Sequence, residues 1–204
     1  MKKKIVTIAF DDGPHEKQDL FHSRSISDNK STSLAKTPLI GVVCRGIQLL
    51  HVHETQIDVD GFNSTEKILE MINSNPFRAE IRLIMIDSPT LGGFNPPNPF
   101  KIYEQTNIPV LLIPDRKPKA PIASVYWEIF PERLIQSKIL QQLPLLSELA
   151  VNINADPKIT GKVYFHAIGI KAGECSELLH HLTHFSQIPE PLRLAHLVAS
   201  RKTQ

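Results

Sequence analysis

The sequence predicts an α/β protein built on a mixed sheet, in which an antiparallel three-strand meander is followed by parallel strands and helices flank the sheet. Three β-rich apolar segments come first, and no helical pattern separates them. Further apolar segments of strand length then alternate with segments of helical spacing. Directly connected strands pair antiparallel, whereas strands joined through a helix pair parallel, so one sheet is expected to contain both kinds of pairing. The 204 residues favour one domain, 1–204.

The first strand is predicted at 5–10, where an apolar, β-branched run stops at Asp11 and Asp12. Gly13 and Pro14 then turn the chain. Two adjacent carboxylates repel each other, and a hard divalent cation such as Mg²⁺ is a common partner that keeps both ionised. The alternative is a solvated turn in which Asp accepts hydrogen bonds from the next backbone amides.

A polar segment at 15–37 follows the two acids, and its centre at 25–33 is rich in Ser, Asp, Asn and Lys. Such a composition buries too little apolar surface to order the chain. We expect a mobile loop that folds over the acids only when a ligand is bound.

Two strands at 39–45 and 47–59 are predicted to form a hairpin through a turn at Arg45 and Gly46. The second strand leads into Asp60. A helix is then expected, capped by Asn63 or Ser64, with its apolar side chains at helical spacing and with Pro76 closing it.

The following segments alternate between strand and helix. An apolar run ending in Asp87 has the pattern of a strand buried on both faces. The predicted elements are a strand at 81–86, a Gly/Pro-rich loop at 88–99, a short helix at 100–105, a strand at 108–113 and, after 121, a mostly helical region with one strand at 163–168.

Asp11, Asp60 and Asp87 each follow a predicted strand, so we expect them to converge on one edge of the sheet. Three converging carboxylates without a basic partner are costly unless they bind a metal, here Mg²⁺ or Mn²⁺. The alternative is that each acid forms a turn or caps a helix.

Charge and cysteine content limit the other possibilities. Lys and Arg total 23 and Asp and Glu 21, so the formal charge of +2 indicates no nucleic-acid or membrane partner by itself. Cys44 and Cys175 lack metal-ligand spacing and are expected to be small buried apolar residues in a reducing compartment. The apolar run at 5–10 is too short for a signal peptide, and no run approaches membrane-spanning length, so a cytoplasmic protein is expected.

The peptide from Phe10 to Pro14 resembles the first motif of polysaccharide deacetylases, which would imply Zn²⁺ and acetylated sugars. That family also needs a His-(Ser/Thr)-x-x-His motif. His22 and Ser23 lack the second His because residue 26 is Ile, and the one suitable His pair, His181 and His184, lies near the far end. The deacetylase hypothesis is therefore the least favoured.

A second resemblance spans nearly the whole chain. It rests on four stretches: 59–72 beginning Val-Asp-Gly-Phe-Asn-Ser-Thr, 84–95 with Ile-Met-Ile-Asp and Gly-Phe-Asn, Ile-Pro-Val at 108–110, and Ile-Pro-Glu-Pro-Leu-Arg-Leu-Ala-His at 188–196. Together they resemble the archaeal family known as domain of unknown function 99 (UPF0215-like). That family is similar to endonuclease V, a ribonuclease H-like nuclease that cleaves near inosine, so the resemblance implies a ribonuclease H-like fold.

The resemblance also implies roles for individual residues. Asp11 matches the first metal-binding Asp of endonuclease V, Asp60 matches its Glu, and Asp87 matches its later Asp, which makes these three the candidate catalytic residues. His196 stands where the nuclease tail has an Asp and joins the candidate metal ligands, with Asp12 beside them.

Several features depart from the nuclease. The Asp60 carboxylate is one methylene shorter, Asp87-Ser-Pro-Thr replaces Asp-Gly-His-Gly, and a strand-end Lys falls near Asp115, with Arg116 one place on. The Pro-Tyr wedge that separates strands around the lesion has no counterpart. Metal binding tolerates these changes better than inosine-specific cleavage does.

Two hypotheses follow from the resemblance. One is a Mg²⁺- or Mn²⁺-dependent nuclease, and the other is a non-catalytic nucleic-acid-binding module on the same fold. DNA or RNA would be bound by a local basic stripe that comprises Arg116, Lys117, Lys119 and Arg193. The alternative is that 116–119 form a solvated loop and that Arg193 pairs with Glu190 on its own helix. The sequence sets no oligomeric state.

Overall fold

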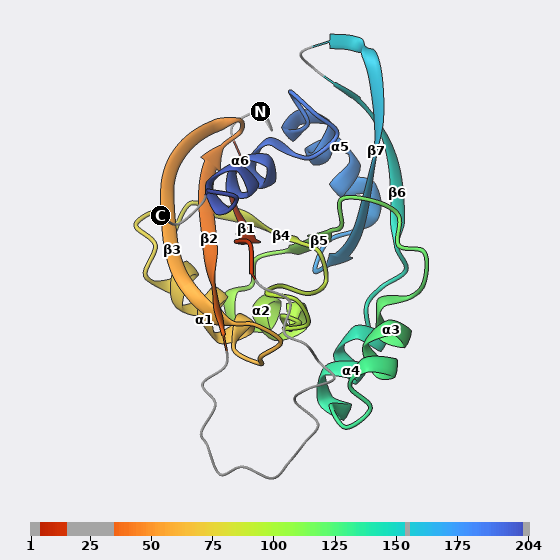
Figure 1. Cartoon of the computed structure of the whole chain (residues 1–204). Coiled ribbons are helices and arrows are strands. Elements are labelled where there is room, and N and C mark those ends of the chain that lie inside the picture. Colours follow the sequence, from red (N-terminus) through yellow and green to blue (C-terminus); the bar gives the residue numbers. More distant parts are fainter. Residues whose placement is uncertain (1–4, 16–34, 154–155, 202–204) are drawn as a thin grey trace.

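The structure is a computed structural model that describes residues 5–15, 35–153 and 156–201. Seven strands form one sheet in the order β3-β2-β1-β4-β5-β7-β6, with helices on both faces (Figure 1). The strands are β1 (Val6–Asp12), β2 (Lys36–Arg45), β3 (Gln48–Asp58), β4 (Ile81–Asp87), β5 (Val110–Ile113), β6 (Ser147–Ile153) and β7 (Asp156–Ile168). The helices are α1 (Ser64–Asn73), α2 (Pro99–Thr106), α3 (Ile122–Ile129), α4 (Leu134–Gln141), α5 (Ala172–Leu182) and α6 (Glu190–Ala199).

The sheet is mixed, as the sequence predicts. Strands β1, β2 and β3 form the antiparallel meander, and β1, β4 and β5 are parallel neighbours. Strand β7 returns antiparallel to β5 and pairs with β6 at the far edge. The meander leaves β1 in the middle of the sheet, with its carboxyl end beside that of β4.

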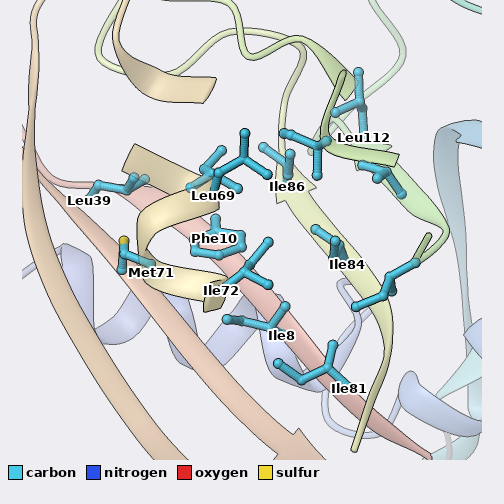
Figure 2. Close-up of a cluster of buried hydrophobic side chains, with 14 of the residues drawn as sticks. Ile8, Phe10, Leu39, Leu69, Met71, Ile72, Ile81, Ile84, Ile86 and Leu112 are labelled. Atoms are coloured by element: carbon cyan, nitrogen blue, oxygen red, sulfur yellow. The ribbon is translucent and has the colours of Figure 1, made fainter. Parts of the chain in front are cut away.

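Two apolar layers hold the helices on the sheet. Alternate residues of β1 and β4 point toward α1, where Ile8 and Phe10 pack with Met71, Ile72 and other side chains (Figure 2). The residues between them, among them Ala9, pack under α5 and α6 on the other face. Because side chains alternate along a strand, Asp11 and Asp12 point to opposite faces of the sheet.

Helices α3 and α4 form a small separate cluster beside the sheet (Figure 1). Tyr126, Phe130 and Leu140 are its buried residues, and Phe94 packs against them from the loop after β4. The Phe94 ring centroid lies 5.7 Å from that of Phe130 and 6.1 Å from that of Tyr126. This aromatic contact fixes α3 and α4 against the loop that follows β4.

The prediction for the last third of the chain is partly wrong. Strand β6 lies in the region interpreted as helical, and β7 begins at Asp156 rather than at 163. Burial alternates along β6 as in an edge strand, with Val151 and Ile153 buried and Asn152 exposed. A strand that buries only one face carries a short apolar pattern, which helical spacing can imitate over a few residues.

The predicted loop at 15–37 is shorter at its end, because β2 begins at Lys36. Residues 16–34 of that loop lie outside the described part of the chain. Cys44 and Cys175 are both buried free thiols, as expected. Among the helices that the structure describes, none is long and apolar enough to cross a membrane.

Candidate functional site

The predicted site residues follow strands that end at one edge of the sheet. Strands β1, β4 and β5 are parallel, and β3 runs in the same direction as β1 because both are antiparallel to β2. Asp11, Asp60 and Asp87 therefore follow strands that end at the same edge of the sheet. That all three converge on one cation stays a prediction. Asp115, just after β5, is a fourth acid there.

Asp11 and Asp87 form a carboxyl pair on the face covered by α5 and α6. The register aligns Phe10 with Ile86, so the next residues along both strands are neighbours on the same face. Burial, then the nearby charges of Asp11, Asp115 and Asp12, raise the pKa of Asp87 to about 8.

His196 of α6 approaches the same pair. Its Nδ1 lies 2.9 Å from Oδ2 of Asp11, and its Nε2 lies 3.4 Å from Oγ of Ser200. The imidazole is 59% exposed, whereas the Asp11 side chain is buried. Burial raises the pKa of Asp11, and the hydrogen bond with His196 opposes that shift. The structure thus brings together two of the three predicted catalytic acids with the predicted His.

Asp12 faces the opposite side of the sheet, toward the loop after β4. Its Oδ2 lies 3.6 Å from Nδ1 of His15. Burial, and next the charge of Asp11, raise the pKa of Asp12 to about 6.

Asp60 is bound to the same loop. Its amide donates to the carbonyl of Gly92 at 2.8 Å, and its Oδ1 accepts from the amide of Phe94 at 2.8 Å. A Cβ on Gly93 would lie only 2.5 Å from Oδ1 of Asp60, and Gly93 has a φ of +78°, so this close approach requires glycine. The loop at 92–94 therefore binds Asp60 through both its amide and its carboxylate.

The backbone of Asp60 is also unusual. Its φ is +52°, a left-handed conformation that Asp tolerates better than most residues do. The guanidinium of Arg133 donates to its carbonyl at 2.7 Å, which ties the segment between α3 and α4 to the site. Asp60 is thus positioned by hydrogen bonds to its amide, its carbonyl and one carboxylate oxygen.

No group of three or more His, Cys, Asp or Glu in the described part of the chain is arranged to hold a metal ion by itself. Mg²⁺ seldom needs such a cage, because it commonly binds through one or two carboxylates together with substrate phosphates and water. Asp11 and Asp87 offer hard oxygen donors, and burial raises the pKa of both, so a bound cation would favour their ionised forms. The pair therefore fits a divalent cation.

Only part of the predicted basic stripe is available to bind phosphate. Arg193 forms two hydrogen bonds with the buried Glu190, at 2.7 and 2.8 Å, as the alternative interpretation proposed. Lys117 lies 3.7 Å from Glu148. Arg116 and Lys119 are exposed on the loop after β5.

Three residues that lie at the site, Asp115, Gly93 and Arg133, are absent from the site residues predicted from the sequence. Asp115 is visible in the sequence as a further strand-end acid, and it was considered only as a departure from the nuclease pattern. Gly93 carries a weak signal as one of two adjacent glycines. Arg133 carries none, because it contacts Asp60 across 73 positions of sequence.

Comparison of the sequence with known families assigns the chain to one of them. The family model described as Endonuclease dU matches residues 3–203. A UPF0215 protein of Thermococcus gammatolerans is 31% identical over 202 residues, which cover 98% of this chain and 93% of that protein. A UPF0215 protein of Thermococcus sibiricus is 32% identical with the same coverage.

Solved structures agree on the fold. A protein of unknown function from Archaeoglobus fulgidus superposes with a TM-score of 0.73 at 25% identity and 96% coverage of both chains. Endonuclease V of Ciona intestinalis, in complex with a DNA containing an inosine followed by a ribo-adenosine, gives a TM-score of 0.56 at 11% identity, covering 98% of this chain and 85% of that one. The catalytic domain of human endonuclease V gives a TM-score of 0.57 at 12% identity, covering 96% of this chain and 81% of that one. The chain therefore has the ribonuclease H-like fold of endonuclease V.

Proposed function

Since this chain belongs to the Endonuclease dU family, we propose that it is a metal-dependent endonuclease that cuts DNA at deoxyuridine. The observation that carries the proposal is the carboxyl pair of the buried Asp11 and the half-buried Asp87 at the shared edge of parallel strands. Family membership supports a nuclease rather than a sugar deacetylase.

We assign the cation site to Asp11 and Asp87, with Asp60 as the third carboxylate and His196 beside Asp11. Oδ1 of Asp60 accepts from the Phe94 amide, so Oδ2 is the oxygen that would be left to hold a cation or one of its water ligands. A bound Mg²⁺ or Mn²⁺ would activate a water and offset charge on the scissile phosphate.

The residues of the chain have separate tasks in this proposal. Asp11 and Asp87 hold the charge that draws the cation to the edge of the sheet. His196, hydrogen-bonded to Asp11 and mostly exposed, orients that carboxylate from the α6 side. Arg116 and Lys119, exposed after β5, attract the phosphates of the strand toward the acids.

The test is cleavage of an end-labelled oligonucleotide that carries one deoxyuridine. Inosine-containing DNA, single-stranded RNA and unmodified DNA are the comparison substrates, each in Mg²⁺, Mn²⁺ or EDTA. We expect a cut near deoxyuridine that needs metal and is lost in Asp11→Asn. Glu80→Gln is the matched control, because Glu80 is a half-exposed acid just before β4 at the opposite edge of the sheet.

Other outcomes separate the alternatives. Salt-dependent binding that survives Asp11→Asn, without cleavage in either metal, would support the non-catalytic binding module instead. Cleavage at inosine and not at deoxyuridine would support a nuclease and would contradict deoxyuridine as its substrate. Absence of both binding and cleavage would reject both functions.

A further inference from the structure

Phe62 is an exposed aromatic residue on a tightly held loop next to Asp60. Its side chain is 52% exposed, although the backbone around it is fixed. The amide of Gly61 donates to the carbonyl of Asp58 at 3.2 Å, and Nδ2 of Asn63 donates to Oδ2 of Asp58 at 3.0 Å. The ring therefore has a defined position, and its exposure does not come from a loose loop.

One side of this ring is occupied by Arg133. The guanidinium carbon lies 4.5 Å from the Phe62 centroid and 3.8 Å from the Phe130 centroid, so the cation sits between two aromatic rings. The same guanidinium donates to the carbonyl of Asp60, and its side chain is only 18% exposed. Arg133 thus supports Phe62 from behind, and it brings positive charge to a part of the molecule where carboxylates predominate.

The exposure of Phe62 differs from that of the aromatic residues in the neighbouring α3–α4 cluster. Phe130 and Tyr126 are buried in the α3–α4 cluster, whereas Phe62 stays outside it. A planar apolar ring backed by a cation, two residues from a proposed metal-binding acid, suits a planar aromatic ligand that carries negative charge. A nucleotide has both properties, since every base has a π-face and its phosphate is an anion.

We propose that the exposed side of Phe62 stacks on a base of the nucleic-acid strand and thereby positions that strand at Asp60. This inference rests on the proposed function and extends it by naming the residue that holds a base. Arg133 is a positioning residue in this arrangement, because it acts through Phe62 and through the carbonyl of Asp60. The contact does not depend on which base is present, because base–aromatic stacking tolerates any sequence.

The test measures binding in EDTA, where metal-dependent cleavage is absent, by fluorescence anisotropy of a labelled single-stranded DNA. Phe62→Leu keeps the apolar bulk and removes the aromatic face, and Phe62→Trp enlarges that face. Leu134→Ala is the matched control, because Leu134 is 53% exposed and adjoins Arg133. We expect Phe62→Leu to weaken binding about tenfold, Phe62→Trp to bind at least as well as the unaltered protein, and Leu134→Ala to change little.

A second series places a single abasic nucleotide at successive positions of the same strand. If Phe62 stacks on a base, the difference between Phe62→Leu and the unaltered protein disappears at one position and persists at the others. A difference that persists at every position, or binding by Phe62→Leu equal to that of the unaltered protein, would overturn the stacking role and leave the nuclease proposal intact. Absence of any binding or cleavage by the unaltered protein would reject both proposals together.

Discussion

The two faces of the sheet edge present acids in opposite environments. On the α5–α6 face, Asp87 lies among other carboxyl groups, and its pKa is raised to about 8. On the α1–α2 side, Asp60 lies among donors: the amide of Phe94 binds its carboxylate, and Arg133 binds its carbonyl. An acid that accepts hydrogen bonds from neighbouring donors can stabilise a loop without any ligand. An acid surrounded by acids needs a cation before it can ionise at neutral pH.

The largest expected effect of this difference is on cleavage. Asp87→Asn keeps the shape of the side chain and removes its charge, so we expect the cleavage rate to fall by about 10² to 10³ in Mg²⁺. Asp60→Asn should lower the cleavage rate less, because the side-chain oxygen of Asn can still accept the hydrogen bond from the Phe94 amide. Single-turnover kinetics on the best substrate measures both. Equal losses for the two variants would mean that the two acids contribute alike and would end the distinction between the faces.

A smaller effect, of opposite kind, is expected on stability. Asp60→Ala leaves the Phe94 amide without its acceptor, so the free energy of unfolding should fall by about 1–3 kcal/mol. Gly93→Ala should cost about 1–3 kcal/mol as well, because a left-handed residue gains a Cβ that clashes with Oδ1 of Asp60. Urea denaturation measures both changes. Asp87→Asn is the contrasting control, because it replaces a carboxyl whose ionised form is disfavoured by burial and neighbouring acids with a neutral amide of the same shape, and it should not destabilise the protein.

The sequence predicts the parts of this arrangement that local periodicity encodes. The apolar runs at 5–10 and 81–86 mark central strands, and an acid that ends each run is expected at the carboxyl edge of the sheet. The two-residue repeat of a strand also places Asp11 and Asp12 on opposite faces, which separates Asp12 from the cation that the sequence was interpreted to place beside both acids. These features depend on neighbours in sequence, which is why they could be predicted.

The parts that could not be predicted depend on contacts between distant segments. Asp60 is positioned by the loop at 92–94 and by Arg133, and no local pattern reports either contact. Strand β6 was missed because its alternation is short and one of its faces is exposed. The family resemblance supplied the candidate residues, whereas their division between two faces required the structure.

The smallest expected effect is a dependence of stability on pH that becomes weaker when metal is bound. A carboxyl whose pKa is raised by folding stabilises the folded protein below its ordinary pKa, and that contribution is lost as the pH rises through the folded value. For Asp87 this window runs from 3.8 to about 8, and for Asp12 from 3.8 to about 6. We therefore expect the melting temperature in EDTA to fall by several degrees between pH 5 and pH 8 from these groups. Mg²⁺ or Mn²⁺ should raise it more at pH 8, because a cation favours the ionised pair. Differential scanning fluorimetry at both pH values, with Asp87→Asn as the variant that flattens the profile, measures the effect. A metal-induced shift that is equal at both pH values, or unchanged in Asp87→Asn, would place cation binding away from the α5–α6 face.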